Sequence, residues 1–332
     1  MRVSLRMSIL ILHIGQPKAG SSAIQKYIAK KKDKYRDRFG ILMMPDLGRD
    51  VLGFYNGSVD ALNRLDDLDF SPKTSITSFE LLWSKVDDLV KLHALKKRLL
   101  EHFTKVNIIV YLRRQDEVFI SGYYSRCLRG QSERFSELKF THSASFDYRR
   151  RLGLWASVFG RGSLTVRRYG PGYLFADDLF QDFCRTAKIP YIHTVFTGAN
   201  RSPSAKTIEL IRLLSKEFEP SVQRKHAIKA IVDAEITGVK LGLSACERRE
   251  IINLYEADNN YVAKRFLGKS KLFDHPIPND GLEYPTLSSL EVVSMMRQVL
   301  RQSGKDEDLF AAEAKASIDV VNAAFIRQFR SV

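Results

Sequence analysis

A loop near the start of the chain combines glycine, lysine and serine in a pattern that suits phosphate binding. The loop Gly15-Gln16-Pro17-Lys18-Ala19-Gly20 follows a continuous apolar run, and a helix is predicted from Ser22, with Gln25 completing a capping box. Glycine lets a backbone come close to an anion, and the free amides at a helix start point toward it. The segment therefore predicts a phosphate site. A plain strand–turn–helix connection with an incidental lysine would have the same pattern.

This loop differs from the Walker A motif of nucleoside triphosphatases. The Walker motif ends in Gly-Lys-Ser/Thr, whereas Gly20 is followed here by serine, and the lysine stands two residues earlier at Lys18. A Walker lysine acts beside a magnesium ion held by the Ser/Thr hydroxyl, and the sequence contains no clustered metal ligands. We therefore expect no metal at the loop and assign its positive charge to Lys18.

A second candidate for anion binding stands at the end of another predicted strand. Arg113 follows the apolar run Val106–Leu112, and Ser121 stands eight residues later inside a predicted helix. A guanidinium offers paired donors to a phosphate, and a hydroxyl one turn into a helix can reach the same oxygens. Strand alternation turns Arg114 to the other side. Taken alone, such an arginine pair is more typical of a solvated strand edge.

Together the two segments resemble the nucleotide motifs of sulfotransferases that use 3′-phosphoadenosine-5′-phosphosulfate (PAPS), especially a bacterial carbohydrate sulfotransferase-like branch. The segment His13–Gln25 is similar to the family's 5′-phosphosulfate loop, in which a threonine usually stands where this chain has Ala19. The change removes one hydroxyl but no backbone amide. In the family, an arginine at a strand end and a serine eight residues on bind the 3′-phosphate. The resemblance reaches from Ile9 to about Phe273, but only these two motifs are specific.

The resemblance implies a donor site, a reaction and a class of acceptor. It implies sulfuryl transfer from PAPS to an acceptor hydroxyl, with 3′,5′-adenosine bisphosphate as the second product. The acceptor would be a bacterial glycan or glycolipid, modified in the cytoplasm or at the inner face of the membrane. Tyr169 would stack on the adenine, although a rim aromatic is an equally good account. The residues expected to bind the nucleotide are Pro17, Lys18, Ala19, Gly20, Ser21, Ser22, Arg113, Ser121 and Tyr169.

Glu80 and Lys18 are the residues expected to act in the transfer itself. In the family, a histidine or glutamate near the end of the intervening strand takes the acceptor's proton, and Glu80 follows the predicted strand Lys73–Ser78. Lys18 would neutralise charge on the bridging oxygen of the departing nucleotide. Glu80 also suits the first turn of a helix, where the dipole favours a carboxylate. His13 is an alternative base, but its place inside a buried strand favours a core histidine.

The elements that must position these residues alternate between strands and helices. This order predicts an α/β fold with an open, mainly parallel sheet of the P-loop type, flanked by helices, and a helical C-terminal part. We expect one α/β domain over residues 1–273, and over 274–332 a loop plus a helical extension packed on the same domain. The predicted strands are Ser8–Ile14, Lys73–Ser78, Val106–Leu112 and Leu164–Arg168. The predicted helices include Glu80 to about Leu100, Glu117–Leu128, Leu174–Ala187, Ala205–Phe218, Ala245–Phe266 and Ser288–Gln302.

The charge balance is strongly positive, with 53 Lys and Arg against 38 Asp and Glu and a net charge of +15. Such an excess favours polyanionic partners, although a generally basic surface would have the same composition. The arginine runs 149–151 and 167–168 could line an anionic acceptor groove or be solvated faces. Two rival functions remain, namely a small-molecule kinase and a non-enzymatic polyanion binder. No aromatic-interleaved basic stripe supports nucleic acid as a partner.

Cysteine usage and hydropathy indicate a reduced compartment and no membrane span. Cys127, Cys184 and Cys246 are odd in number and far apart, so we expect free thiols, as in a cytoplasmic protein. The apolar run after Arg2 and Arg6 is too short for a signal sequence. No apolar stretch is long enough to cross a bilayer, so any membrane contact would be peripheral.

Overall fold

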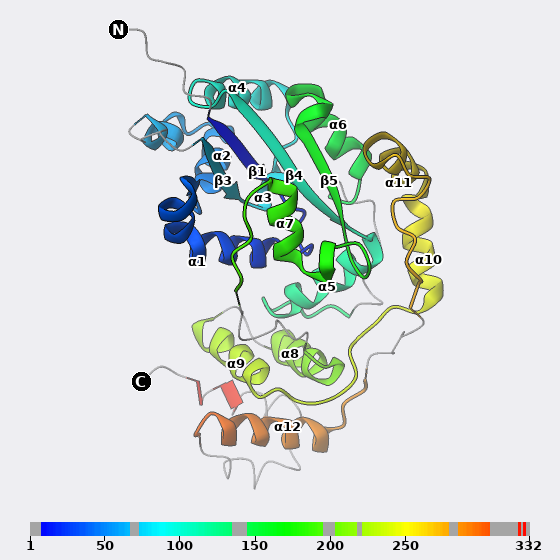
Figure 1. Cartoon of the computed structure of the whole chain (residues 1–332). Coiled ribbons are helices and arrows are strands. Elements are labelled where there is room, and N and C mark those ends of the chain that lie inside the picture. Colours follow the sequence, from blue (N-terminus) through cyan, green and yellow to red (C-terminus); the bar gives the residue numbers. More distant parts are fainter. Residues whose placement is uncertain are drawn as a thin grey trace. The chain divides into compact units, whose positions relative to one another are not determined.

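The chain forms two compact units, each assembled from three segments. The first contains Met1–Val118, His142–Val195 and Ile251–Pro276, and the second contains Phe119–Thr141, Phe196–Glu250 and Ile277–Val332. The computed structural model (Figure 1) describes residues 8–66, 73–134, 145–194, 203–217, 221–278, 285–305, 325–326 and 328–329. The division of the sequence at residue 273 stays a prediction.

The first unit is built on a five-stranded sheet in which all neighbouring strands are parallel. Its strands are β1 (Ile9–His13), β2 (Ile41–Met43), β3 (Thr74–Ser78), β4 (Lys105–Arg113) and β5 (Leu164–Tyr169), in the order β2-β3-β1-β4-β5. The predicted α/β fold is confirmed. Because β1 lies between β3 and β4, the strand order reverses there, and parallel α/β sheets bind ligands outside the strand ends at such a point.

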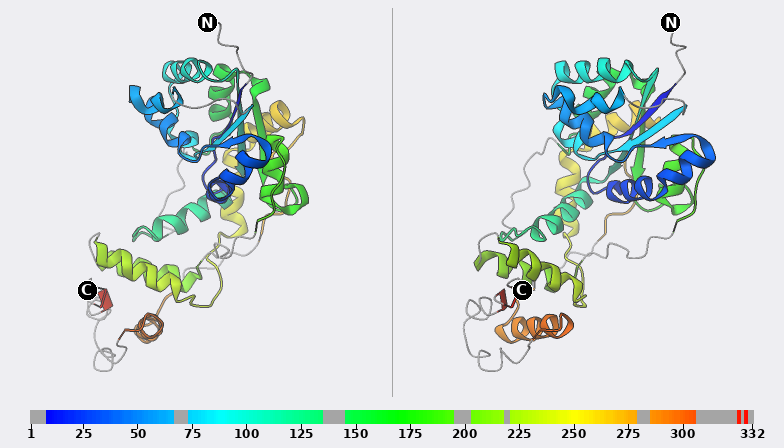
Figure 2. Two further views of the ribbon diagram at one scale, coloured as in Figure 1. Left: turned by 60° about the vertical axis from the view of Figure 1, so that its left-hand side comes forward. Right: turned by 90° about the vertical axis from the view of Figure 1, so that its left-hand side faces the viewer.

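Helices cover both faces of this sheet, as the two views of Figure 2 show. Leu12 of β1 packs in a core shared with helices of one face. On the other face, His13 packs edge-on against Tyr111 and against Phe183. Burial on both faces explains why β1 and β4 are continuous apolar runs without polar alternation. One face carries α1 (Ser21–Phe39) and α7 (Leu179–Ala187), and the other carries α2 (Leu47–Tyr55), α4 (Leu89–Leu100) and α6 (Tyr148–Phe159).

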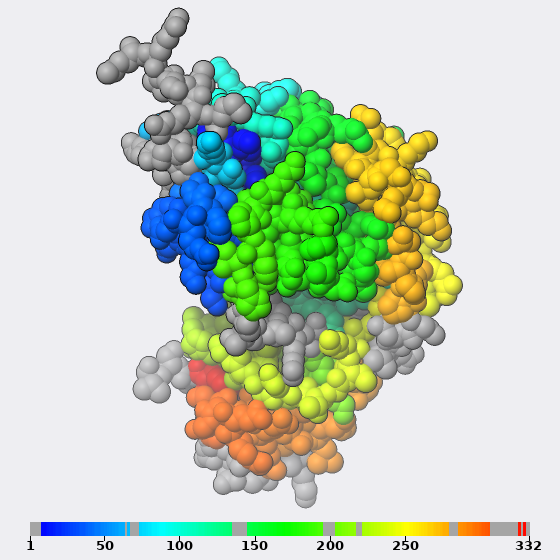
Figure 3. Space-filling model, in the orientation of Figure 1, coloured from blue at the N-terminus to red at the C-terminus, as the bar shows by residue number. Residues whose placement is uncertain are grey.

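The side chains of α1 and α7 close the face that is turned to the viewer in Figure 3. Tyr27 of α1 stacks on Phe180 of α7, with the ring centroids 5.1 Å apart. The hydroxyl of Tyr35 donates to the carbonyl of Pro190 over 2.6 Å. These contacts fix α1 along its length, and with it the position of the loop from which α1 starts.

Two strands, β2 and β3, separate the two phosphate motifs, whereas the sequence predicted one. The missed strand β2 has three residues, of which Ile41 pairs with Thr74 of β3. A run of three residues is too short to show a period, so only its pairing identifies it as a strand. β3 itself was predicted, and it delivers the chain to Glu80 at the same edge of the sheet as the phosphate loop.

Two predicted helices are interrupted in the structure. The expected helix from Glu80 to Leu100 is divided into α3 (Leu81–Lys85) and α4. The carboxylate of Asp88 accepts from the amide of Lys91 over 3.0 Å and so caps a new helix start. The expected helix Ala245–Phe266 is divided into α10 (Ala245–Leu254), α11 (Glu256–Val262) and a π-helical turn (Ala263–Leu267).

The described part of the second unit is helical, as predicted for the C-terminal half. The helices α8 (Ala205–Glu217), α9 (Val222–Asp233) and α12 (Ser289–Gln302) share an apolar core that includes Leu210, Ile228 and Met296. The helices α5 (Gln115–Cys127) and α10 each have residues in both units. Within the described ranges, no helix has the length and apolar character needed to span a membrane.

Candidate functional site

The loop after β1 turns tightly against the end of β4. The amide of Tyr111 donates to the carbonyl of Gly15 over 2.8 Å, and the amide of Gln16 donates to the carbonyl of Tyr111 over 3.0 Å. Gly15 has a φ of +117°, and a Cβ at this position would lie 3.2 Å from the backbone of Glu80. The close approach therefore requires glycine, and it places the backbone of Glu80 directly beside the loop.

Gln16 fastens the loop to the second predicted motif. Its Oε1 accepts from the amide of Arg113 over 3.0 Å, and its Nε2 donates to the hydroxyl of Tyr148 over 2.9 Å. That hydroxyl donates in turn to the carbonyl of Arg113 over 2.5 Å. Gln16 is 1% exposed, so water does not compete for these bonds. Neither Gln16 nor Tyr148 was predicted as a site residue. Gln16 is only one polar residue inside a tight loop, and Tyr148 is an aromatic residue far along the chain, so no local pattern marks either of them.

The helix α1 begins at Ser21 with a start that suits an anion. Gly20 is the N-cap with a φ of +83°, no described side chain caps the helix, and its first turn contains no acidic residue. The first intrahelical bonds run from the amides of Ala23 and Ile24 to the carbonyl of Gly20. The amides of Ser21 and Ser22 come before these bonds, where a helix binds phosphate most readily.

The two serines at this helix start are not equivalent. The hydroxyl of Ser21 is buried and donates to the carbonyl of Gln16 over 2.8 Å. Ser22 is exposed. In this arrangement Ser22 is the hydroxyl donor available to a ligand, while Ser21 stabilises the loop. The expected capping box is wrong, since Gln25 donates its amide to Oε2 of Glu80 and does not close the helix start.

Lys18 lies within the turn in a conformation that is uncommon for a residue with a side chain. Its φ is 68°, in the left-handed region, and its side chain is half-buried. Its carbonyl accepts from Nη1 of Arg113 over 3.1 Å. A left-handed residue of this kind costs about 1–2 kcal/mol and persists only where neighbouring contacts hold it. Contacts with β4 therefore determine the shape of the loop.

Arg113 lies between the loop and Tyr169. It is the register partner of Tyr169 across β4 and β5, and its guanidinium lies 5.6 Å from the centroid of that ring. Its Nε donates to Oε2 of Glu117 over 2.8 Å. The Tyr169 ring also lies against the loop. A Cβ added to Gly20 would be 3.0 Å from this ring. The structure thus brings Lys18, Gly20, Arg113 and Tyr169 together at the carboxyl edge of the sheet.

The predicted partner of Arg113, Ser121, belongs to the second compact unit. It lies on α5, which begins at Gln115 in the first unit. Its joint binding of a 3′-phosphate with Arg113 stays a prediction. The neighbouring Arg114 is buried and pairs with Asp116 over 2.7 Å.

Glu80 stands where β3 leads into α3, next to the phosphate loop. It is half-buried, and the amide of Trp83 donates to the carbonyl of Ile14 over 3.1 Å, which attaches the start of α3 to the loop. Its carboxylate makes no capping bond to α3 and instead accepts from Gln25 of α1. A side chain on one element therefore orients a carboxylate on another.

His13 is a core histidine, as the preferred interpretation of the sequence had it. It is 0% exposed, and its Nδ1 lies 2.7 Å from Oγ of Ser78. Burial lowers its pKa from the ordinary value of 6.5 to about 3, although a hydrogen bond with the backbone of Gly15 opposes this shift. A neutral imidazole enclosed in the sheet cannot contact an acceptor in this structure.

Three arginines of the two basic runs are engaged within the fold. Arg151 is buried and donates to the carbonyl of Val86 over 2.6 Å. Arg167 pairs with the buried Asp182, and Arg168 donates to Asp274 over 3.2 Å. These side chains stabilise the first unit, so they give no support to an acceptor groove.

Comparisons of the chain with protein-family models, with curated proteins and with solved structures gave no match. The interpretation of the site therefore depends on its geometry and on the motif resemblance.

Proposed function

We propose that this chain transfers a sulfuryl group from PAPS to an acceptor hydroxyl, with the nucleotide bound at the carboxyl edge of the sheet between β1 and β4. The observation that carries the proposal is the contact between the two anion-binding segments. Nη1 of Arg113 lies 3.1 Å from the carbonyl oxygen of Lys18. Two cationic segments that meet at a strand-order reversal suit a ligand with two separate phosphate groups.

The loop and the start of α1 would hold the 5′-phosphosulfate end of the donor. The ligand groups are the amides of Ser21 and Ser22, the Ser22 hydroxyl and the Lys18 ammonium. Arg113 would bind the 3′-phosphate. Its Nε and Nη1 are used by Glu117 and by the loop, and among the described residues no partner is recorded for Nη2. This nitrogen would donate to a phosphate oxygen, with Tyr169 beside the adenine.

The reaction would be an in-line displacement at sulfur. The acceptor oxygen forms a bond to sulfur while the bond between sulfur and the bridging phosphate oxygen breaks. Glu80, oriented by Gln25, would take the acceptor's proton, and Lys18 would neutralise the charge that develops on the bridging oxygen. As in phosphoryl transfer, alignment and charge placement would supply most of the acceleration. The products are a sulfate ester and 3′,5′-adenosine bisphosphate.

We further propose a bacterial glycan or glycolipid as the acceptor, modified in the cytoplasm or at the inner membrane face. Two observations support this class, namely the resemblance to the bacterial branch and the net charge of +15, which favours acidic acceptors. Transfer of labelled sulfate to a panel of acidic and neutral glycans would test it. Equal labelling of both kinds would contradict the role given to the charge.

Calorimetry with 3′,5′-adenosine bisphosphate, AMP and ATP tests the donor site. We expect the native chain to bind the bisphosphate more tightly than AMP or ATP. Arg113→Ala should weaken binding of the bisphosphate by about tenfold or more and binding of AMP much less. Only the bisphosphate loses a charged hydrogen bond to its 3′-phosphate. Arg150→Ala, which removes an exposed arginine from α6, is the matched control and should leave both affinities unchanged.

The same panel separates the rival functions. Equal losses for both nucleotides in Arg113→Ala would mean that the 3′-phosphate assignment is wrong. Magnesium-dependent turnover of ATP would favour a small-molecule kinase. Binding of polyanions that falls steeply with salt and survives Lys18→Ala would favour a non-enzymatic binder.

A further inference from the structure

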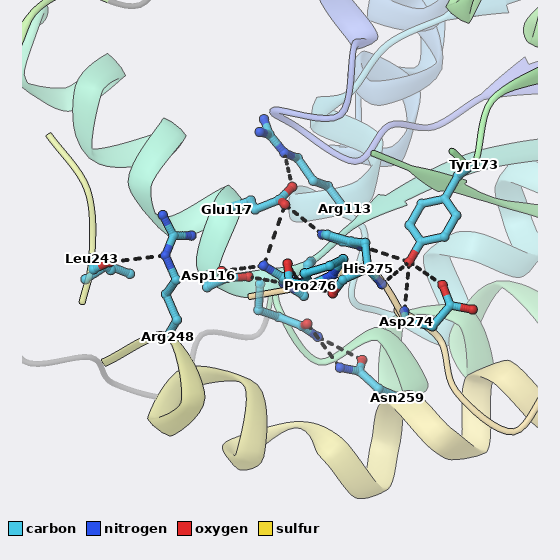
Figure 4. A network of polar contacts seen from close by, with 12 residues as sticks. Arg113, Asp116, Glu117, Tyr173, Leu243, Arg248, Asn259, Asp274, His275 and Pro276 are labelled. Atoms are coloured by element: carbon cyan, nitrogen blue, oxygen red, sulfur yellow. Dashed lines mark hydrogen bonds and ion pairs between the residues drawn. The ribbon is translucent and has the colours of Figure 1, made fainter. Parts of the chain in front are cut away.

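A line of polar contacts leads from Arg113 to residues outside both nucleotide motifs (Figure 4). Oε2 of Glu117 accepts from Nε of Arg113 over 2.8 Å, and Oε1 of Glu117 lies 2.8 Å from Nε2 of His275. Nδ1 of His275 lies 2.8 Å from the hydroxyl oxygen of Tyr173. All four residues belong to the first unit. The arginine proposed to bind the 3′-phosphate is therefore the end of a longer chain of bonds.

The Glu117 carboxylate is held at both oxygens. Its side chain is 14% exposed, and that of His275 is 10% exposed. Burial alone would raise the pKa of Glu117, but hydrogen bonds from His275 and from Arg113 outweigh it and lower this pKa to about 2. The group is thus a carboxylate at any working pH. It cannot rotate without breaking one of two charge-assisted bonds.

The contact with Glu117 assigns the donor atom of His275. A carboxylate can only accept, so Nε2 of His275 carries a proton and donates it to Oε1 of Glu117 over 2.8 Å. Farther along the chain of bonds, the Tyr173 oxygen accepts from the amides of Asp274 and His275 over 2.8 and 3.1 Å, and its hydroxyl donates to Oδ1 of Asp274 over 2.7 Å. Tyr173 therefore holds the segment that carries His275.

The backbone of His275 is fixed from two sides, so its ring has a defined position. On one side, the amide of His275 donates to the hydroxyl oxygen of Tyr173. On the other, Nη1 of Arg114 donates to the carbonyls of His275 and Pro276 over 2.9 and 3.2 Å. The two neighbouring arginines thus have different tasks. Arg113 contacts the phosphate loop, whereas Arg114 anchors the segment that supports Arg113 through Glu117.

We propose that Glu117 and His275 are positioning residues for recognition of the 3′-phosphate, an inference that rests on the proposed function. A guanidinium is planar, so bonds at Nε and Nη1 together determine the direction of Nη2. Glu117 holds Nε, and His275 holds Glu117. Without the donor at His275, Oε1 of Glu117 keeps only the longer ion pair with Arg114 at 3.8 Å. The carboxylate can then rotate, and Nη2 of Arg113 no longer points in one direction. Leucine and glutamine are both uncharged, so comparing these two replacements of His275 tests positioning at equal charge near the ligand.

The test compares two substitutions of His275 by calorimetry with 3′,5′-adenosine bisphosphate and AMP. His275→Leu fills a similar volume without a donor. It should weaken binding of the bisphosphate by about tenfold, which is the effect of one hydrogen bond to a charged group. Binding of AMP should weaken by less than about twofold, because AMP has no 3′-phosphate. His275→Gln keeps an N–H donor and should recover most of the affinity. A merely structural role for the side chain would lower both affinities together. If His275→Leu does not fold, His275→Ala gives the donor-free state.

His102→Ala is the matched control. Nε2 of His102 also faces a carboxylate, at 3.2 Å from Oδ1 of Asp66, but it precedes β4 and so lies at the amino edge of the sheet. Its loss should change neither affinity. A native chain that does not prefer the bisphosphate to AMP would overturn the proposed function. A native preference that His275→Leu leaves intact would overturn the positioning role alone.

Discussion

Gln16 has no role in the proposed chemistry, yet it determines where two segments of the site lie. Gln25 and Glu117 also have no role in the proposed chemistry. Gln25 orients the carboxylate of Glu80, and Glu117 holds the guanidinium of Arg113. In each case a side chain that is not proposed to touch the ligand helps to position a residue that is. A binding residue needs such support because small displacements are costly in catalysis. The nucleotide motifs alone therefore describe only part of the site.

At the residue scale, Lys18→Ala should reduce sulfuryl transfer by about 10²–10³-fold, the loss typical for one electrostatic contact to a developing charge. The fold should persist, because alanine keeps the backbone carbonyl that Arg113 contacts. Transfer of labelled sulfate from PAPS measures the activity, and circular dichroism checks the fold. Lys26→Ala, which removes an exposed lysine of α1, is the control. Unchanged turnover in Lys18→Ala would rule out the role of the lysine.

At the element scale, the long buried strands were predictable and the short or interrupted elements were not. The runs Ser8–Ile14 and Val106–Leu112 differ from β1 and β4 by one residue at each end. Two-sided burial makes such runs apolar throughout, and turns delimit them. The three-residue β2 has no comparable signal. The Glu117–His275 contact joins positions 158 residues apart, and no local pattern specifies a pair at that separation.

The two glycines at the ends of α1 give the prediction at this scale. Gly20 and Gly40 both have positive φ, of 83° and 59°. A Cβ at Gly20 would lie 2.5 Å from the Leu179 side chain and 3.0 Å from the Tyr169 ring, whereas at Gly40 it would meet nothing within 4 Å. Gly40→Ala should therefore destabilise the fold by about 1–2 kcal/mol through backbone strain alone and leave nucleotide binding unchanged.

Gly20→Ala should cost more stability than Gly40→Ala, and it should also weaken binding of 3′,5′-adenosine bisphosphate, because the loop and Tyr169 must both shift. Urea unfolding measures the first effect and calorimetry the second. Equal effects of the two substitutions on binding would contradict the placement of the nucleotide at the start of α1.

At the scale of the whole molecule, net charge says less about partners than the sequence suggested. Arg151 is enclosed among backbone carbonyls, and burial lowers its pKa. Its charge counts toward the net of +15, but the buried side chain is not a contact for an acidic glycan. Composition cannot distinguish such an arginine from a surface one, because the difference depends on tertiary packing. The acceptor class must therefore be tested by binding and turnover.

The buried imidazole of His13 predicts how the stability of the first unit depends on pH. The pKa of His13 is about 3 in the folded chain and 6.5 for an exposed histidine. Between these values the unfolded chain binds a proton that the folded chain does not, so the free energy of unfolding decreases as the pH falls from 6.5 toward 3. One such group contributes a slope of up to about 1.4 kcal/mol per pH unit.

Urea unfolding at pH 7, 6 and 5, followed by tryptophan fluorescence, measures this slope. The chain has two tryptophans, Trp83 and Trp155, and both are buried in the core of the first unit, so the signal reports that unit. His13→Asn removes the titrating group and should flatten the dependence between pH 6.5 and 5. His93→Asn, at an exposed position of α4, should leave the slope as it is. An equal slope in the native chain and in His13→Asn would mean that the folded state accepts a proton at His13, and the imidazole would then have access to solvent at the end of β1 beside the phosphate loop.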